Sequence, residues 1–112
     1  MAEHYGFATV LHNTSFTTSS DTSATFADDK KAIGTAVSCL LTGSAGTFEV
    51  QRQMKKSGAW VSVEAAPLAL VDGELYTVTY DFPLGVCRVK VNAAAPGAGV
   101  TAEVEARSKG RM

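Results

Sequence analysis

The chain lacks the features by which several functional classes are recognised. Its longest apolar run, residues 36–41, is far shorter than the roughly 20 residues of a membrane span. With 10 basic and 11 acidic residues the net charge is −1, which argues against the broad basic surface of a nucleic-acid-binding protein. No segment repeats apolar residues at i, i+3, i+4 and i+7 over three turns, so the sequence predicts no helix.

Export signals and cysteines are also scarce. Residues 1–6 contain no basic region followed by an apolar one, so we expect no signal peptide and no passage through a secretion machinery. The only two cysteines, Cys39 and Cys87, each lie in an alternating apolar pattern. Reduced, buried thiols are the favoured interpretation, and a disulfide between the two is the alternative.

What the chain does contain is short alternating segments separated by turn residues. About eight strands are expected, over residues 5–11, 35–42, 47–54, 59–64, 68–71, 74–81, 87–91 and 100–107. The Thr- and Ser-rich residues 15–26 can form an edge strand or an arm but supply little core. At 112 residues the chain is one domain. We predict an all-β protein, a single small antiparallel β-sandwich of jelly-roll or immunoglobulin-like type.

Within this domain, residues 1–34 are predicted to form an arm or edge strands, residues 35–107 the core sandwich and residues 108–112 a polar tail. Residues 35–42 are apolar on both faces, which is typical of a central strand. In residues 47–54 we expect Phe48, Val50 and Met54 to point inward, with Arg52 as an exception on that face.

Three turns suggest pairings between strands. Lys55-Lys56-Ser57-Gly58 reads as a hairpin turn, and Asp72-Gly73 is a strong hairpin signal because both residues tolerate positive φ. The Gly-rich loop at residues 93–99 suggests a hairpin joining residues 87–91 to residues 100–107. Antiparallel pairing there would place Arg88 and Lys90 on the same solvated face as Glu103 and Glu105.

No group of residues forms a recognisable catalytic, cofactor or metal constellation. The candidates are histidines near acidic residues, a serine in a turn and two carboxylate pairs: His4, His12, Glu3, Asp28, Asp29, Ser44, Glu103 and Glu105. They lack the spacing of a zinc site and the context of an activated serine. We therefore predict no catalytic residues, no cofactor and no metal, and a protein that is not an enzyme.

Surfaces for binding are the remaining candidates. Trp60, Tyr76, Tyr80 and Phe82 would form a sugar-binding platform if two or more rings faced water, although core packing is the commoner fate of a lone Trp. Residues 14–25 and 93–99 are weak as isolated structure and could become ordered against another chain. Basic residues near the C-terminus, Arg107, Lys109 and Arg111, could dock on an acidic surface or belong to a frayed tail.

One pattern in the sequence resembles a known class. It comprises Gly46-Thr47-Phe48-Glu49-Val50-Gln51, Ser57-Gly58-Ala59-Trp60, Cys87-Arg88-Val89-Lys90-Val91 and, after a Gly-rich loop, Val100-Thr101-Ala102-Glu103-Val104. These segments resemble those of small β-sandwich virion proteins of tailed bacteriophages, of the capsid decoration (cement) or head and tail fibre type. The resemblance covers about the last two thirds of the chain.

The resemblance implies a structural role without catalysis. It predicts a capsid decoration or cement protein that binds the outer shell and bridges capsomers, located on the virion surface after assembly in the host cytoplasm. Its partners would be the major capsid protein or other virion proteins. The protein would itself be a homo-oligomer, with a trimer favoured, and would bind no nucleic acid and no membrane. A neck, tail or fibre component is the alternative, and a carbohydrate-binding β-sandwich module is a second alternative.

Overall fold

The computed structural model describes residues 7–28 and 30–110, and this part of the chain is entirely β-strand and loop. Its strands are β1 (Phe7–Asn13), β2 (Ser20–Thr22), β3 (Phe26–Ala27), β4 (Gly34–Thr42), β5 (Gly46–Gln53), β6 (Trp60–Ser62), β7 (Leu68–Leu70), β8 (Leu75–Tyr80), β9 (Val86–Ala93) and β10 (Thr101–Lys109). Over the described ranges no helix capable of crossing a bilayer is present.

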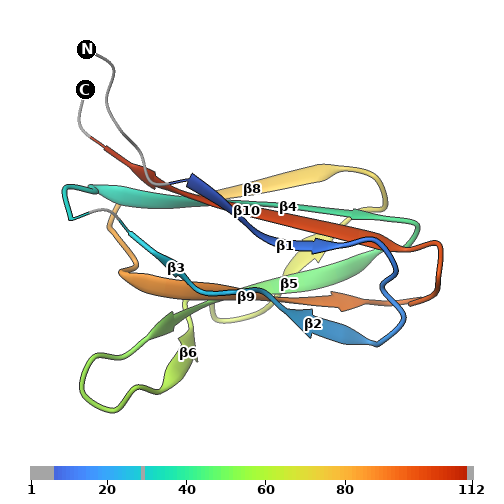
Figure 1. Ribbon diagram of the computed structural model, residues 1–112, viewed down its shortest axis with the longest axis horizontal. Helices are drawn as coiled ribbons and strands as arrows, with labels where there is room; N and C mark the ends of the chain where they lie inside the picture. The colour runs from blue at the N-terminus through green and yellow to red at the C-terminus, as the bar shows by residue number, and fades with distance from the viewer. Residues whose placement is uncertain (1–6, 29, 111–112) are drawn as a thin grey trace.

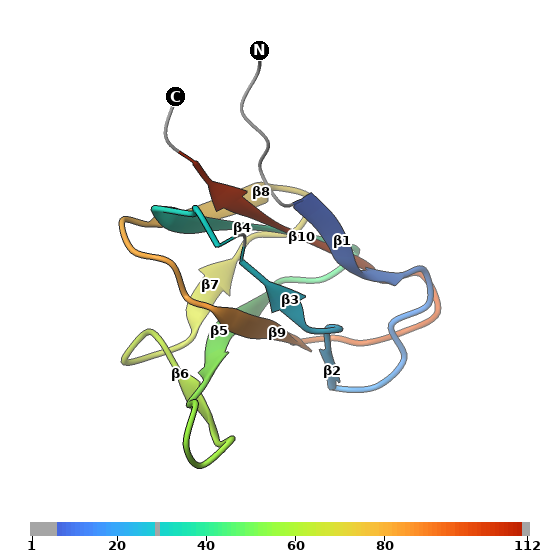
Figure 2. The ribbon, with the colours of Figure 1, turned by 60° about the vertical axis from the view of Figure 1, so that its left-hand side comes forward.

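Two antiparallel sheets are stacked face to face. One has the order β1-β10-β4-β8, and the other has β2-β9-β5-β6 with β3 also on β9 and β7 also on β5. Figure 1 shows the first sheet above the second, and Figure 2 shows β7 and β6 following one another along the β5 edge. The predicted all-β antiparallel sandwich is confirmed.

The order of the strands identifies the sandwich as a jelly roll. If β2 with β3, and β6 with β7, are each counted as one interrupted strand, eight strands remain, in the orders 1-8-3-6 and 2-7-4-5 of two interlocking Greek keys. The jelly-roll form of the two expected sandwich types is therefore the one observed. Residues 7–27 supply edge strands to both sheets.

The predicted hairpin between residues 87–91 and 100–107 is wrong. β9 lies between β5 and the β2/β3 edge, whereas β10 lies in the other sheet between β1 and β4. Lys90 is therefore opposite Glu49, and Glu103 is opposite His12 and Leu40. In a jelly roll most connections cross from one sheet to the other, so the loop at residues 93–99 is a crossover.

The Asp72-Gly73 turn is a crossover for the same reason. β7 pairs with β5 in one sheet and β8 pairs with β4 in the other, so the hairpin that this dipeptide suggested does not form. Of the two residues that could take positive φ, only Gly73 does so, with a φ of 79°, and Asp72 does not. Its N–H donates to the Leu41 carbonyl oxygen at 2.8 Å, and the Asp72 carboxylate accepts from the Gly43 N–H at 2.8 Å.

The core fills the space between the sheets with apolar side chains from both. Val37, Cys39 and Leu41 of β4 are fully buried, and β4 is central as predicted. The other members of this core cluster are Val10, Phe16, Phe26, Phe48, Val50, Leu70, Tyr80, Leu84, Cys87, Val89, Val91, Ala93, Val100, Ala102, Val104 and Ala106. Burying each larger side chain stabilises the fold by roughly 1.5–3 kcal/mol.

Two segments that the sequence suggested could become ordered against another chain lie against each other. The Phe16 N–H donates to the Val100 carbonyl at 2.8 Å, and the Gly97 N–H donates to the Phe16 carbonyl at 2.8 Å. The ring of Phe16 is completely buried. Residues 14–25 and 93–99 therefore pack within one chain, and the Thr/Ser-rich segment contributes to the core more than its composition suggested.

At one end of the sandwich the Asp28 carboxylate links its own segment to three others by hydrogen bonds. The Asp28 carboxylate accepts hydrogen bonds from the Thr35 hydroxyl (2.6 Å), the Ser108 hydroxyl (2.7 Å) and the Gly85 N–H (3.0 Å). The Thr35 hydroxyl oxygen in turn accepts from the Leu84 N–H at 2.9 Å. Thr35 and Ser108 are buried, so this network links the segment after β3, β4, the β8–β9 connection and the end of β10.

Two local expectations are corrected here. Met54 is 46% exposed, because it follows the end of β5 and lies outside the sandwich. The expected polar tail from residue 108 begins later, since β10 continues to Lys109 and the Ser108 side chain is buried by the contact with Asp28. Arg52 does lie on the inward side of β5, opposite Cys87, as predicted.

Candidate functional site: the outer face around Trp60

The β5–β6 hairpin extends beyond the body of the sandwich. Figures 1 and 2 show it projecting past the β9–β5 sheet. Gly58 closes the turn with a φ of 73°, and its N–H donates to the Met54 carbonyl at 2.9 Å. The Met54 N–H donates to the Ala59 carbonyl at 2.8 Å, so the predicted hairpin is confirmed. Residues 54–59 are all exposed.

Trp60 is fixed at the base of this hairpin. It is opposite Gln53 on the outer face of the sheet, and its side chain is half-buried. The Arg88 guanidinium carbon lies 4.4 Å from the centre of the Trp60 ring, within the range of a cation–π contact. The Arg88 Nε–H also donates to the Gln51 side-chain oxygen at 2.8 Å. Arg88 therefore covers part of the ring and holds its orientation.

Polar side chains continue along the same face. The Ser62 hydroxyl donates to the Glu49 carboxylate at 2.7 Å, and Lys90 is opposite Glu49 on the neighbouring strand. These outward side chains alternate with the buried Phe48 and Val50 along β5. The outer face around Trp60 is thus a row of hydrogen-bonded polar groups with one aromatic ring at its end.

The hairpin carries a local excess of positive charge. Between Gln51 and Ala59 the chain has Arg52, Lys55 and Lys56 and no acidic residue, in a protein whose net charge is −1. The Arg52 Nε atom is buried and has no hydrogen-bond partner in the described part of the chain. Lys55 and Lys56 are exposed at the tip, where they are available to an acidic partner surface.

The other predicted aromatic residues do not join Trp60. Tyr76 and Tyr80 belong to β8 in the opposite sheet, where the Tyr76 ring packs edge-on against Phe48 with centres 5.5 Å apart. Tyr80 is buried and its ring lies 5.8 Å from that of Phe82, which is 47% exposed. Sequence reasoning found the four rings, but the fold places only Trp60 on the outer face of the β9–β5 sheet.

Tyr80 has an unusual environment. Its hydroxyl is buried without a hydrogen-bond partner among the described residues. Burial, together with the nearby Glu64 carboxylate, raises its pKa above the ordinary value for tyrosine. The phenol therefore remains protonated throughout the neutral range.

The residues considered for metal binding and catalysis are separated by the fold. His12 lies exposed on β1, and Asp28 belongs to the network at one end of the sandwich. Glu3, His4 and Asp29 lie outside the described residues. Ser44 is buried in a turn, where its hydroxyl donates to the Ala45 carbonyl at 2.6 Å and accepts from the Ala95 N–H at 2.9 Å. Residues 7–28 and 30–110 contain no cluster of three potential metal ligands.

The carboxylate pair Glu103 and Glu105 lies on the outer face of β10. Glu103 is opposite His12 of β1, and Glu105 is opposite Thr9. Both side chains are only half-buried, and on the other side of β10 they are opposite Leu40 and Ser38 of β4. They are consistent with charges on a solvated sheet face.

The two cysteines are free thiols in the core. Both are buried, Cys39 in β4 and Cys87 in β9, and they are not joined by a disulfide. Burial raises the pKa of Cys39 to about 12, and burial with the nearby Asp28 carboxylate raises the pKa of Cys87 to about 12. Neither thiol is a nucleophile at neutral pH, because the thiolate is the reactive form.

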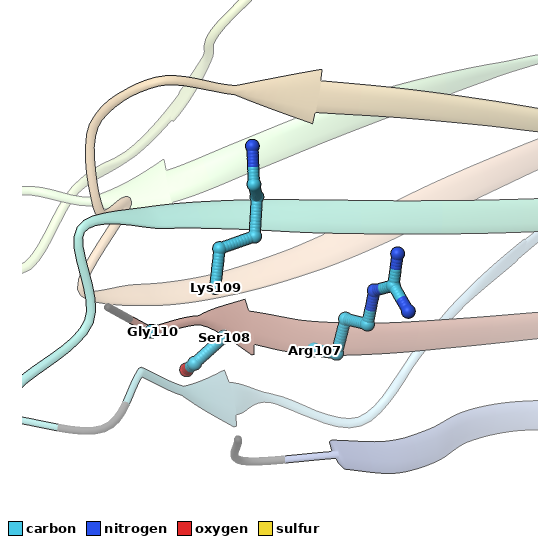
Figure 3. A pocket seen from close by; sticks show the side chains of 4 residues that line it. All are labelled: Arg107, Ser108, Lys109 and Gly110. Atoms are coloured by element: carbon cyan, nitrogen blue, oxygen red, sulfur yellow. The ribbon is translucent and has the colours of Figure 1, made fainter. Parts of the chain in front are cut away.

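A small hollow lies beside the end of β10. Its volume is about 200 Å³, and Arg107, Ser108, Lys109 and Gly110 line it. Figure 3 shows the Arg107 and Lys109 side chains on one side of the strand and Ser108 on the other. The structure thus places two of the three basic docking candidates on one face, while Arg111 lies outside the described residues.

The contact between Trp60 and Arg88 was missed by sequence reasoning. Arg88 was assigned to a face shared with Glu103 and Glu105, because β9 was paired with the wrong strand. Gln51 and Arg88 each alternate with buried residues along their strands. This alternation shows that both side chains point outward. Only the β5–β9 register brings those two outward residues together beside Trp60.

No protein-family model matches the chain, and a search of curated proteins finds no match.

Proposed function

We propose that this protein is a structural component of a tailed-bacteriophage virion, a capsid decoration or cement protein that binds the outer shell and bridges capsomers. The resemblance in the last two thirds of the chain supports the class. The observation that carries the proposal is the projecting β5–β6 hairpin, which presents Lys55 and Lys56 beyond the sandwich and has Trp60 at its base.

The mechanism is burial of surface against the shell. Met54 is 46% exposed and Val61 is 42% exposed, so the hairpin offers apolar area beside its basic tip. The stacking of Arg88 on Trp60 keeps the base of the hairpin in one conformation, which reduces the entropy lost on docking. A standard interface of about 1,600 Å² would suffice when many symmetric copies act together.

Binding to expanded capsids that lack this protein tests the proposal. The double charge reversal Lys55→Glu with Lys56→Glu should weaken binding by at least tenfold, roughly the effect of 1.4 kcal/mol, and should remove the gain in heat stability of the capsid. The matched control reverses the adjacent pair Lys30 and Lys31, which is exposed elsewhere on the molecule. Wild-type protein that does not bind the capsids, or a hairpin variant that binds normally while the control fails, would contradict the proposal.

A neck, tail or fibre component would dock through the same side chains as a decoration protein, but it would be present in fewer copies per virion. Hundreds of copies per virion indicate decoration, whereas about a dozen or fewer indicate a neck or tail component. Quantitative gel analysis of purified virions distinguishes these outcomes. Light scattering of the purified protein tests the predicted homo-oligomer and its favoured trimeric state.

A carbohydrate-binding module is the second candidate, and one observation favours it. Trp60 is half-exposed on a face that also carries the side chains of Gln51, Glu49 and Ser62, which can hydrogen-bond to sugar hydroxyls. Stacking on a single ring partly covered by Arg88 offers less area than a platform of several rings. A glycan array with Trp60→Ala as control tests this function, and binding that survives the substitution would eliminate it.

A further inference from the structure

The edges of the two sheets differ in how they are protected against pairing with another strand. The β1 edge is broken by a register shift between Thr9 and Leu11. The β2/β3 edge consists of strands of three and two residues, and the β6/β7 edge of two strands of three residues, each interrupted by a loop. Bulges and short strands are the usual means by which edges are kept from pairing.

The edge formed by β8 has none of these devices. Its six residues, Leu75–Tyr80, pair with β4 in an unbroken register. The sequence Leu-Tyr-Thr-Val-Thr-Tyr contains no charge and no proline and consists of residues that favour strands. Among the described residues β8 pairs with β4 alone, and Figure 1 shows it as the last strand of its sheet. Its outer side therefore presents unpaired backbone groups.

Side chains at this edge are also open to a partner. Leu75 is 66% exposed on the outer face of the sheet, and Tyr76 is 40% exposed on the inner side, at the open flank of the sandwich. Thr77 is held by a 2.9 Å hydrogen bond between its hydroxyl and that of Ser38, so the strand is fixed from the β4 side. A strand added at this edge would pair with a strand whose conformation is already fixed, and it would contact apolar side chains on both faces of the sheet.

The charged residues beside β8 indicate which kind of strand can pair with its outer edge. Acidic residues border β8 at both ends, Glu74 before it and Asp81 after it, and the basic residue nearest to this edge in the fold is Lys109, whose side chain lies over Gly34 beside Tyr80. A second copy of this chain pairing antiparallel on β8 would bring Glu74 of each copy within about one residue of Asp81 of the other. Like charges placed this closely disfavour pairing, and opposite charges favour it.

We propose that the outer edge of β8 accepts an added β-strand from a partner protein. The partner segment is extended and uncharged over about six residues, alternates apolar with small polar side chains, and has Lys or Arg at both ends. Backbone hydrogen bonds supply the affinity, as in other cases of strand addition, and the acidic residues at both ends of β8 supply the selectivity. This surface is independent of the hairpin and Trp60, so the inference does not rest on the proposed function.

The test uses capped peptides with the core Thr-Val-Thr-Val-Thr, flanked by two Lys residues at each end or by two Glu residues at each end. On titrating the Lys-flanked peptide into ¹⁵N-labelled protein, amide signals of residues 75–80 should shift. Every second amide in that range should gain protection from hydrogen exchange, because successive amides of a strand point to opposite neighbours. The Glu-flanked peptide should bind at least fivefold more weakly, the selectivity expected from charges at both ends of the strand.

Matched variants place the same charge on two edges of one sheet. Thr79 of β8 and Thr9 of β1 are both exposed, and Thr79→Lys should weaken peptide binding at least fivefold while Thr9→Lys leaves it unchanged, since an inserted Lys protects an edge. Unfolding midpoints of both variants establish that they are folded. Three results would each overturn the proposal. They are amide shifts that lie outside residues 75–80 instead of within them, equal binding of both peptides, and a dimer of the free protein that Thr79→Lys dissociates.

Discussion

Replacing Asp28 by Ala should be among the most destabilising changes to a partly exposed residue of this protein. Its carboxylate accepts hydrogen bonds from the hydroxyls of Thr35 and Ser108 and from the Gly85 N–H, at 2.6, 2.7 and 3.0 Å. Hydrogen bonds to a charged group contribute roughly 1.5–3 kcal/mol each, and a buried donor left without its acceptor costs about 1–3 kcal/mol. Thr35 is fully buried, so water cannot readily replace the carboxylate.

The three contacts share one acceptor and Gly85 is exposed, so their contributions do not simply add. We expect Asp28→Ala to lower the free energy of unfolding by about 3 kcal/mol, which corresponds to a melting temperature roughly 10 °C lower for a domain of this size. Asp28→Asn keeps the shape but loses one acceptor oxygen, and should cost about half as much. Urea unfolding followed by circular dichroism measures both.

Asp81→Ala is the matched control. Asp81 is exposed and has no hydrogen bond or ion pair with the described residues, so its removal should change stability by less than about 0.5 kcal/mol. If Asp28→Ala proved no more destabilising than this control, the network would not hold the end of the sandwich and the reasoning would be refuted.

Three further outcomes are expected. Stability should fall as pH rises from about 9 toward 12, because the folded-state pKa values of Cys39 and Cys87 are raised to about 12 and unfolded thiols ionise first. Replacing both by Ala should reduce the fall of the urea midpoint above pH 8, and the part that remains above about pH 10 is expected from Tyr80, whose pKa is also raised by burial. Gly46→Ala should prevent folding or cost more than about 3 kcal/mol, since its Cβ would collide with the Asn92 carbonyl oxygen, whereas Gly97→Ala enters open space and should be tolerated in thermal melts. Phe16→Ala should cost about 3–5 kcal/mol in urea unfolding, and a loss below 1 kcal/mol would contradict its place in the core.

Local pattern was sufficient to predict the central strands. The apolar faces of residues 35–42 correctly predicted a central strand. Alternation in residues 47–54 correctly placed Phe48 and Val50 of β5 in the core and wrongly placed Met54 there, because the strand ends before Met54. The Lys55-Lys56-Ser57-Gly58 hairpin was also predictable, since its two strands are joined by the turn itself.

Strand partnership was not predictable in the same way. A Gly-rich loop or an Asp-Gly turn shows that the chain reverses, but it does not show whether the next strand stays in the sheet or crosses to the other one. β9 and β10 alternate equally well in either arrangement, and only the combined packing of all strands selects the crossover. Phe16 was underestimated for a related reason, because composition averaged over residues 15–26 conceals one aromatic anchor.

The candidate site was predictable in part. Trp60 was recognised as a candidate from its residue type, although the sequence favoured core packing for its ring. Its outward direction comes from its pairing with Gln53 in the structure. The Arg88 contact and the Asp28 network both join residues distant in sequence, across 28 positions in the first case and up to 80 in the second. Such pairs have no local signal, so they appear only when the topology is known.

The pairing of the first strand with the last has a practical use in protein engineering. Phe7 of β1 is opposite Arg107 of β10, so the two ends of the described chain are neighbours. A short peptide linker could therefore join them, and new ends could be opened at the exposed tip around Ser57, giving a circularly permuted molecule with the same sheets. Cargo attached next to Phe7 or next to the end of β10 would in turn be displayed from the same corner of the sandwich, away from the hairpin.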